Sequence, residues 1–289
     1  MGLESWSEIT DPRGIASDRL TISGDTEATQ AFRRSQASRH VVLTMPGIVG
    51  RAPYSNRANP VEAFAFDESG PPLVIGAHWP LGVCLANAFR THGWLAKIHG
   101  NANGGAVAGL AQAVFDASAE PRVAETQISD RRENELMKAG LTSLVMIKNT
   151  DQATFLSVPT LYRPADAAEQ IGQAAGRALA LELTHARLAH HLMCMCRDWV
   201  GGHREGPQLQ AELEFWLQQY VSTEPLTDQE LLAKFPLRHA GIAVEPSRDP
   251  GYYQARLDIS PAFQFQGFEY DISGLLILPQ GRGTLFTSA

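Results

Sequence analysis

The sequence predicts a mixed α/β (α+β) fold, in which helices pack on layered mixed sheets and the chain ends in an extended β-strand. Short apolar runs, typical of buried strands, alternate with stretches of helical spacing in the first half of the chain. The second half changes from strongly helical sequence to strand-like runs from Tyr252 onward. Hydrophobic residues make up 44% and charged residues 19%, which is usual for a globular protein. Strands that alternate with helices favour α/β layers over a β-sandwich.

The first half is expected to supply most of these layers. Three helices are expected over 27–37, 80–92 and 130–139, and four strands at 41–43, 94–99, 123–128 and 141–148. Asp130 and Glu133 have the spacing of a capping box, and Gly140 follows the end of that helix. Residues 51–72 contain four prolines and no periodicity, with an apolar patch at Phe64 and Phe66. Such long ordered loops are uncommon and are often functional.

The second half is expected to be helical first and extended later. Residues 165–200 are strongly helical, a helix follows Pro207, and a capping box at Thr227 begins another. Two strands are expected over 252–259 and 268–278. The sequence therefore predicts an α/β region over 1–160 and a region of helices and terminal strands over 161–289.

Charge and composition exclude several classes of protein. The 24 Lys and Arg residues against 31 Asp and Glu give a net charge of −7, which argues against a nucleic-acid binder. No apolar stretch is long enough for a transmembrane span, and the start at Met1 lacks the features of a signal peptide. Three cysteines suit a reducing compartment better than a disulfide framework. We therefore expect a cytoplasmic chain with no membrane insertion.

The helix at His190, Cys194 and Cys196 is the best candidate for a metal site. His190 and Cys194 are four residues apart and would share one helical face. Cys-x-Cys is not the usual spacing of structural zinc, however, and free cysteines are usually buried as small apolar groups. The core interpretation is favoured, so we expect no metal, no cofactor and no catalytic residues, with a metal-dependent enzyme as the alternative. The loop 100–105 lacks the Lys-Ser/Thr of a P-loop, and either a sharp turn or a close approach of the backbone to a neighbour explains its glycines more simply.

Two segments leave their role open on residue pattern alone. The run Asp130-Arg131-Arg132-Glu133 fits either a charge-paired helix start or a contact with another subunit. The final strand alternates apolar and acidic residues at 268–272 and is continuously apolar at 275–278. That pattern fits either an internal strand or a strand that pairs with the sheet of another chain.

Several segments, taken in order, resemble the large subunit of the contractile sheath of bacterial type VI secretion systems. Residues 128–136 (Ile-Ser-Asp-Arg-Arg-Glu-Asn-Glu-Leu) are similar to the family's I-x-D-R-R-E-x-E-L motif. Residues 187–192 with Arg197-Asp198 resemble its R-F-A-H-Y-L…R-D helix. Further matches in the family's order are 2–6, 11–13, 52–54, 59–64, 249–253 and 260–267. Each motif is weak by itself, and their common order across nearly the whole chain is specific.

The chain also departs from the family pattern. His99 stands in place of an arginine, Ala52 in place of a leucine and Ala262 in place of a histidine, and the tail 281–289 runs past the usual end. Family chains extend further on the N-terminal side, so this sequence resembles a C-terminal portion, and the elements that join neighbouring protomers there are expected outside it.

The resemblance implies a tail-sheath-like fold and a structural rather than enzymatic role. It implies a small sheath subunit and further copies of this chain as partners in a helical sheath around an inner tube protein. It also implies a AAA+ ATPase that dismantles the contracted sheath, together with baseplate components. Because family members link protomers by pairing strands between chains, interface residues are expected in the terminal strand, at Phe268, Tyr270, Ile272, Leu275 and Ile277. The charged helix start, read as a contact with another subunit, adds Asp130, Arg131, Arg132 and Glu133 as expected interface residues. A soluble adaptor that binds sheath parts without polymerising is the other alternative.

Overall fold

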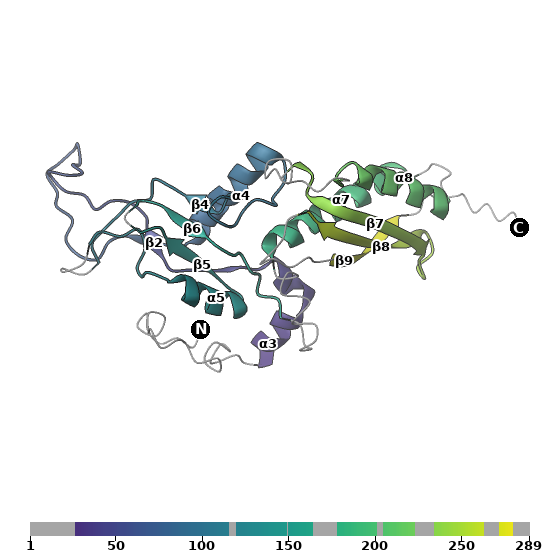
Figure 1. The fold of residues 1–289 in the computed structure, drawn as a ribbon, viewed down its shortest axis with the longest axis horizontal. Helices are drawn as coiled ribbons and strands as arrows, with labels where there is room; N and C mark the ends of the chain where they lie inside the picture. Colours follow the sequence, from purple (N-terminus) through teal and green to yellow (C-terminus); the bar gives the residue numbers. More distant parts are fainter. Residues whose placement is uncertain are drawn as a thin grey trace, which may run out of the picture. The chain divides into compact units, whose positions relative to one another are not determined.

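The computed structural model describes residues 27–115, 120–148, 150–163, 178–200, 205–222, 234–262 and 272–279 (Figure 1). These residues form two compact units. The first unit contains the residues before 92 and those between 97 and 179, and the second contains residues 92–96 and those from 180 onward. The predicted division at residue 160 into two regions stays a prediction.

A four-stranded mixed sheet forms the centre of the first unit, in the order β1-β5-β6-β4. The strands are β1 (Leu43–Met45), β4 (Ala106–Val107), β5 (Leu141–Met146) and β6 (Ala153–Phe155). β1 runs parallel to β5, with Leu43 opposite Leu141, whereas β6 is antiparallel to both of its neighbours. The mixed α/β class predicted from the sequence is confirmed.

Helix α5 (Asp130–Lys138) packs its apolar face against this sheet. Leu136 and Ala139 form a buried cluster with Met45 of β1, Leu141 of β5 and Ile128. Gly140 has a φ of +82°, and its amide donates to the Met137 carbonyl at 2.9 Å, so the chain turns from α5 directly into β5.

Arg33 ties helix α3 (Glu27–Arg34) to the end of α5, and a 3₁₀ turn, η1 (Gln36–His40), follows α3. The Arg33 side chain is 2% exposed, and its guanidinium donates to the carbonyls of Ala139 at 2.6 Å and Leu161 at 3.2 Å. A cation at a helix C-terminus satisfies the carbonyls that the helix leaves without partners. The buried arginine thus closes the C-terminal end of α5.

The second helix of the first unit, α4 (His78–His92), begins close to the predicted position and carries Pro80 in its first turn. Leu81, Cys84 and Ala88 form its buried face. Burial raises the pKa of the Cys84 thiol to about 11, so this thiol stays protonated at neutral pH.

Two strands expected in this part of the chain were wrong. Residues 94–99 bury Trp94, Ala96 and Ile98 in alternation, as a strand would, but they belong to no strand of the structure. Residues 123–128 also belong to no strand of the structure and make one isolated bridge, between Ala124 and Ile48. In both segments the apolar pattern reports burial, because an extended chain can be buried without entering a ladder.

In the described residues of the second unit, helices α7 and α8 pack with an antiparallel sheet in the order β7-β8-β9. The helices are α7 (Leu179–Asp198) and α8 (Gly206–Gln218), and the strands are β7 (Leu237–Pro246), β8 (Tyr252–Pro261) and β9 (Ile272–Pro279). The expected C-terminal strand is confirmed, whereas β7 was missed because Gly241 and several polar residues interrupt its apolar alternation. The capping box at Thr227 lies outside the described residues. None of the described helices combines the length and apolarity needed to cross a membrane.

Residues 92–96 join the second unit through an aromatic cluster. The ring of Trp94 meets the ring of Tyr220 edge-on at 5.2 Å between centroids, and Tyr220 meets Trp216 of α8 at 4.9 Å. The Arg187 guanidinium lies 4.9 Å from the Trp94 ring centroid and also donates to the Gly93 carbonyl. The segment is therefore held against α7 and α8 by ring contacts and one cation–π interaction.

Candidate subunit interface

The two outer strands of the second sheet differ in what covers them. β9 pairs along its whole length with β8, from Ile272 opposite Ile259 to Pro279 opposite Tyr252. Within the part of the chain that the structure describes, no strand pairs with the other side of β9. Among the described residues, β9 is therefore an edge strand whose outer side is open.

The outer side of β7, by contrast, is covered by α8 and by the chain that follows it. Gln210 of α8 accepts a hydrogen bond from the Val244 amide at 3.0 Å, and Gln218 donates to the Ala240 carbonyl at 3.1 Å. Near the start of β7, the Ser222 amide donates to the Leu237 carbonyl at 2.9 Å. The sequence alone did not single out Gln210 and Gln218. The signal that could have found them is their position on α8, each one residue after a buried leucine (Leu209 and Leu217).

The same two hydrogen bonds fix which backbone groups of β9 face outward. In an antiparallel sheet, the N–H and C=O of one residue point to the same side and those of the next residue point to the other side. The backbone N–H and C=O of Val244 point away from β8, so those of Ala255, opposite Val244, point toward β9. The backbone groups of Leu276, opposite Ala255, therefore point back toward β8. The outward residues of β9 are therefore Ser273, Leu275 and Ile277.

The side chains of β9 alternate in the same way. Ile272, Leu276 and Leu278 are buried, whereas Leu275 and Ile277 are 62% and 48% exposed. Leu275 lies opposite Arg256 of β8, which pairs with Asp258 at 3.0 Å on the same exposed face. The aliphatic side chains of Leu275 and Ile277 are thus exposed to solvent beside the open edge of β9.

The structure thereby sorts the predicted residues of the terminal strand. Leu275 and Ile277 lie exposed at the open edge, as a pairing strand requires, and Ile272 is buried against the protomer's own core. Phe268 and Tyr270 lie outside the described residues. The interface role of all five residues stays a prediction.

The four predicted interface residues at the start of α5 divide between surface and interior. Asp130 is exposed, and Arg131 is 72% exposed with its guanidinium 3.5 Å from a Glu135 carboxylate oxygen. Arg132 is buried and binds the other oxygen of Glu135 at 2.5 Å. The N-cap is Ser129, whose hydroxyl accepts from the Arg132 amide at 3.4 Å, so the predicted capping box of Asp130 and Glu133 was wrong. Only Asp130 and Arg131 are placed to meet another chain.

Glu133 points into the first unit. Its side chain is 6% exposed, and its carboxylate accepts a short hydrogen bond from the Ser157 hydroxyl. Burial raises the pKa of Glu133, the neighbouring charge of Asp130 raises it further, and the Ser157 hydrogen bond opposes the rise. Glu133 therefore links α5 to residue 157 inside the protomer rather than presenting a charge at its surface.

The helix at His190, Cys194 and Cys196 shows no grouping of ligands. Cys196 is 2% exposed, and burial raises the pKa of its thiol to about 11, whereas His190 is exposed. His191 stacks on Trp216, with 5.9 Å between the ring centroids. In the part of the chain that the structure describes, no three His, Cys, Asp or Glu side chains are grouped to hold a metal ion.

The glycine loop at 100–105 uses its amides within the protein. The Gly100 amide donates to the Phe155 carbonyl at 2.7 Å, and the Gly105 amide donates to the Gly100 carbonyl at 3.0 Å. A Cβ at Gly105 would lie 2.6 Å from the Phe155 carbonyl oxygen, so no side chain fits there. The close approach of the backbone, expected from the sequence, is confirmed.

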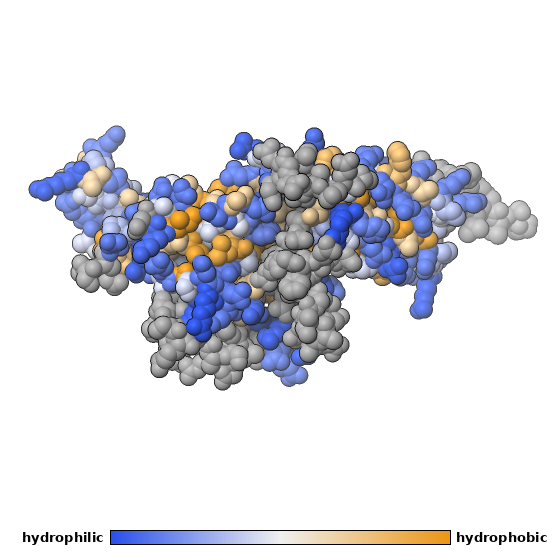
Figure 2. Space-filling view, in the orientation of Figure 1, coloured by the Kyte–Doolittle hydropathy of each residue, from blue (hydrophilic) through white to orange (hydrophobic). Residues whose placement is uncertain are grey.

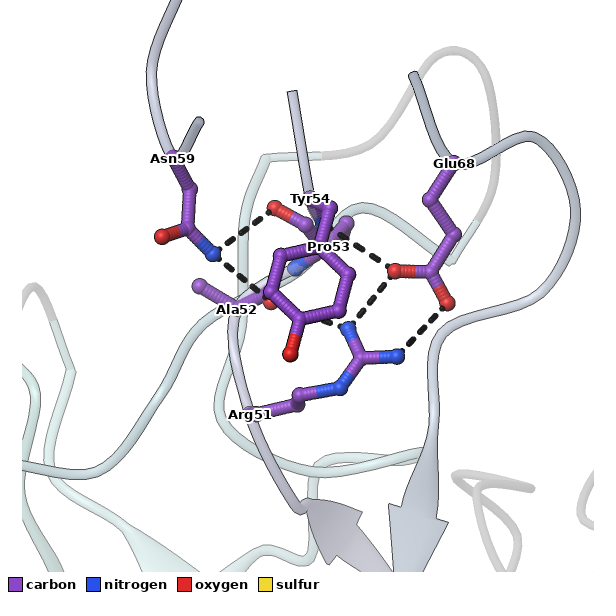
Figure 3. A network of polar contacts seen from close by, with 6 residues as sticks. All are labelled: Arg51, Ala52, Pro53, Tyr54, Asn59 and Glu68. Atoms are coloured by element: carbon purple, nitrogen blue, oxygen red, sulfur yellow. Dashed lines mark hydrogen bonds and ion pairs between the residues drawn. The ribbon is translucent and has the colours of Figure 1, made fainter. Parts of the chain in front are cut away.

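The predicted long loop is an ordered projection between β2 (Ile48–Val49) and β3 (Val74–Ile75). We call residues 51–68 the 51–68 loop; Figure 1 draws it in blue, extending beyond β2 at the left. At its base, Arg51 forms a two-point ion pair with Glu68 at 2.6 and 3.1 Å, and its guanidinium lies 4.1 Å from the Tyr54 ring centroid (Figure 3). Glu68 also accepts from the Tyr54 amide at 3.0 Å, and these hydrogen bonds lower the pKa of Glu68.

Comparisons with known proteins agree with the resemblance seen in the motifs. Residues 1–162 match the model of the EvpB/VC_A0108 tail sheath N-terminal domain, and residues 168–275 match that of the EvpB/VC_A0108 tail sheath gpW/gp25-like domain. The type VI secretion system sheath protein TssC1 of Pseudomonas aeruginosa is 32% identical to this chain over 298 residues. The alignment takes in 98% of this chain and 59% of TssC1, so the chain spans little more than half the length of that relative. The chain belongs to the EvpB/VC_A0108 tail sheath family.

Proposed function

We propose that this chain is a structural, non-enzymatic subunit of the contractile sheath of a type VI secretion system, and that the open edge of β9 is one of its bonds to a neighbouring subunit. The observation that carries the proposal is the open edge itself, with its outward residues Ser273, Leu275 and Ile277, in a chain of the tail sheath family. The TssC1 match supports the assignment to this secretion system.

In the proposed assembly, this chain pairs with a small sheath subunit and stacks with further copies of itself around an inner tube protein. In this scheme the sheath assembles in the cytoplasm with its subunits in an extended packing. Their repacking into a contracted form of lower energy drives the inner tube outward. Baseplate components are further partners in this scheme, and a AAA+ ATPase dismantles the contracted form. In this scheme the work comes from repacking between subunits, so the chain needs no catalytic site of its own.

Strand pairing at β9 would supply both affinity and register. Each outward residue offers one N–H and one C=O to a strand laid alongside it, as in recognition by strand addition. Burying an aliphatic side chain such as Leu275 or Ile277 contributes about 1.5 to 3 kcal/mol when it becomes fully buried. The period-two pattern of the strand would then admit one register and exclude a shift by one residue.

The test uses proline at an outward position. Leu275→Pro removes an N–H that points to the open side, so the protomer should keep its fold while sheath tubes disappear. Leu275→Ile is the matched control, because it keeps both the N–H and the aliphatic side chain and suits a strand. Proline at Ile272 is unsuitable, because that N–H points toward β8 and its loss would weaken the protomer itself.

The readout is native lysate pelleted by ultracentrifugation and imaged by electron microscopy, together with thermal unfolding of the purified variants. Hollow tubes are expected from the wild type and from Leu275→Ile, and none from a folded Leu275→Pro. Ile277→Lys provides a second variant at an exposed position, where a charge should block the edge without disturbing the fold. Normal tubes from both Leu275→Pro and Ile277→Lys would contradict the edge assignment. A wild-type chain that stays in the supernatant would contradict the sheath role and favour an adaptor.

A further inference from the structure

The 51–68 loop carries two solvent-exposed phenylalanines, and polar contacts within the loop fix its conformation. Phe64 and Phe66 are 61% and 40% exposed, and their ring centroids lie 6.0 Å apart. The Asn56 side chain accepts from the Phe66 amide at 2.8 Å and donates to Asp67 at 2.7 Å. Figure 2 shows hydrophobic residues among hydrophilic ones on this projection.

The two limbs of the loop are joined at several levels. Arg51 and Glu68 close its base, and the Asn59 side chain donates to the carbonyls of Ala52 and Pro53 at 3.2 and 3.3 Å (Figure 3). The Tyr54 ring also meets the Phe66 ring edge-on at 6.5 Å. A loop without regular structure that is fixed in this way loses little conformational entropy on binding. Two exposed rings on a preorganised support are typical of a protein-binding anchor.

Helix α4, in the same unit, carries a different apolar surface. Trp79 and Val83 are 63% and 48% exposed, are one helical turn apart, and are followed on the same face by Ala86 and Arg90. We call these four residues the α4 stripe. In Figure 1 the 51–68 loop extends away from the body of the first unit, whereas α4 lies against that body, so one copy does not bring the two surfaces together.

The two surfaces have complementary charges. Glu62 and Asp67 flank the phenylalanines of the loop, and both are exposed. Helix α4 contains no Asp or Glu, and its stripe ends at the exposed Arg90. The rings of the loop, flanked by the carboxylates of Glu62 and Asp67, thus match an apolar helix face with a basic end, and such a match fixes orientation more than it adds affinity.

We propose that the 51–68 loop of one copy docks on the α4 stripe of another copy of this chain. The contact is heterologous, because it joins two different surfaces, and such contacts propagate into rings or open helical filaments rather than closed dimers. The inference rests on the proposed function to the extent that it places this contact between neighbouring copies in the sheath. Phe64 and Trp79 are its central residues, and Glu62 and Arg90 set its direction.

The test is photocrosslinking from the loop in the full chain. Phe64→p-benzoylphenylalanine replaces one aromatic ring with a photoreactive one, and isotopically labelled and unlabelled copies are mixed before irradiation so that crosslinks between copies can be recognised. Mass spectrometry should find residue 64 of one copy joined to a peptide that contains residues 79–90 of another. Trp79→Ala should lower the yield at least about tenfold, as expected for the loss of a central aromatic anchor.

Two controls keep the result specific. Val114→Ala changes another exposed apolar residue, which is 47% exposed, and should leave the yield unchanged. Phe215→p-benzoylphenylalanine places the photoreactive group on α8, where Phe215 is 75% exposed, and should give no crosslink to residues 79–90. Crosslinks from residue 64 to a different protein, crosslinks confined to single copies, no crosslink, or an unchanged yield in Trp79→Ala would overturn the inference.

The inference and the proposed function fail separately in this design. Tubes whose residue 64 crosslinks elsewhere would leave the sheath role intact and remove the docking assignment. Crosslinks between the 51–68 loop and the α4 stripe in concentrated purified chain, without tubes, would support the docking surface although the sheath role had failed.

Discussion

The two edges of the β7-β8-β9 sheet are treated in opposite ways by the same chain. The edge of β7 is closed by Gln210, Gln218 and the backbone near Ser222, whereas β9 offers Ser273, Leu275 and Ile277 outward with no partner strand among the described residues. A sheet closed at one edge and open at the other can be extended in only one direction. The difference teaches that α8 covers one edge of this sheet with side-chain hydrogen bonds, whereas among the described residues the other edge stays available for the strand pairing proposed above.

The largest expected effect is a difference in stability between substitutions on the buried and on the exposed face of β9. Leu276→Ala removes a buried side chain and should lower the free energy of unfolding by about 2 to 5 kcal/mol. Leu275→Ala, one residue earlier, should change it by less than about 0.5 kcal/mol while weakening assembly. Urea unfolding of both purified variants, together with sedimentation of assembled material, checks this. Equal losses of stability would contradict the outward direction of Leu275.

The next effect concerns the closed edge. Gln210→Ala combined with Gln218→Ala leaves the Val244 amide and the Ala240 carbonyl without their partners, which should cost about 1 to 3 kcal/mol. The double variant also uncovers a second edge, so it should self-associate more than the wild type in sedimentation-velocity experiments. Gln208→Ala, at an exposed position of the same helix, is the control and should leave both properties unchanged. Wild-type stability in the double variant would show that α8 does not close β7.

The smallest effect tests whether the start of α5 belongs to the protomer's interior. Burial raises the pKa of Glu133 above its ordinary value of 4.5, so the folded chain binds that proton more tightly than the unfolded chain. The free energy of unfolding should therefore fall as pH rises through the range above 4.5. Glu133→Gln keeps an acceptor for Ser157, should reduce that pH dependence, and should stabilise the chain at pH 7 by about 1 kcal/mol or less.

Denaturant titrations from pH 4 to pH 8 measure the Glu133→Gln effect, with Glu62→Gln as a control at an exposed carboxylate. Assembly should be unaffected by either change. If the Glu133→Gln variant kept the wild-type pH dependence of the free energy of unfolding but formed no tubes, Glu133 would have to be an interface residue after all.

Much of the fold could be predicted from sequence because local signals and packing agree in those elements. Helix α5 combines acidic residues in its first turn, an apolar face at Leu136 and Gly140 after its end, so its bounds were predicted within one residue. The strands expected at 94–99 and 123–128 failed because alternation reports burial on one side, and a ladder also needs a partner that local sequence does not name. For β7 the error was the opposite one, because a real strand was not predicted. Its neighbours β8 and α8 stabilise a strand whose own apolar alternation is weak.

The candidate site was predictable in kind and less so in detail. The apolar run at 275–278 indicated a strand able to pair, but only the register with β8 shows that Leu275 and Ile277 face outward and Leu276 inward. Likewise, the Arg131-Arg132 pair indicated a charged helix start, and burial then separated the two side chains. In each case neighbouring residues of one motif take opposite roles, because a helix or strand presents successive side chains to different surroundings.

The open edge of β9 also sets terms for the synthesis of this protein in the cell. In the assembly proposed above, a copy made before its partner would expose the outer edge of β9, unpaired among the described residues, and two aliphatic side chains, which is the pattern that promotes edge-to-edge aggregation. Production in step with the covering chain would keep such copies scarce, and surplus copies would be natural substrates for chaperones and proteases. If β9 pairs with another chain as proposed, matched expression of the two chains is thus a consequence of this strand.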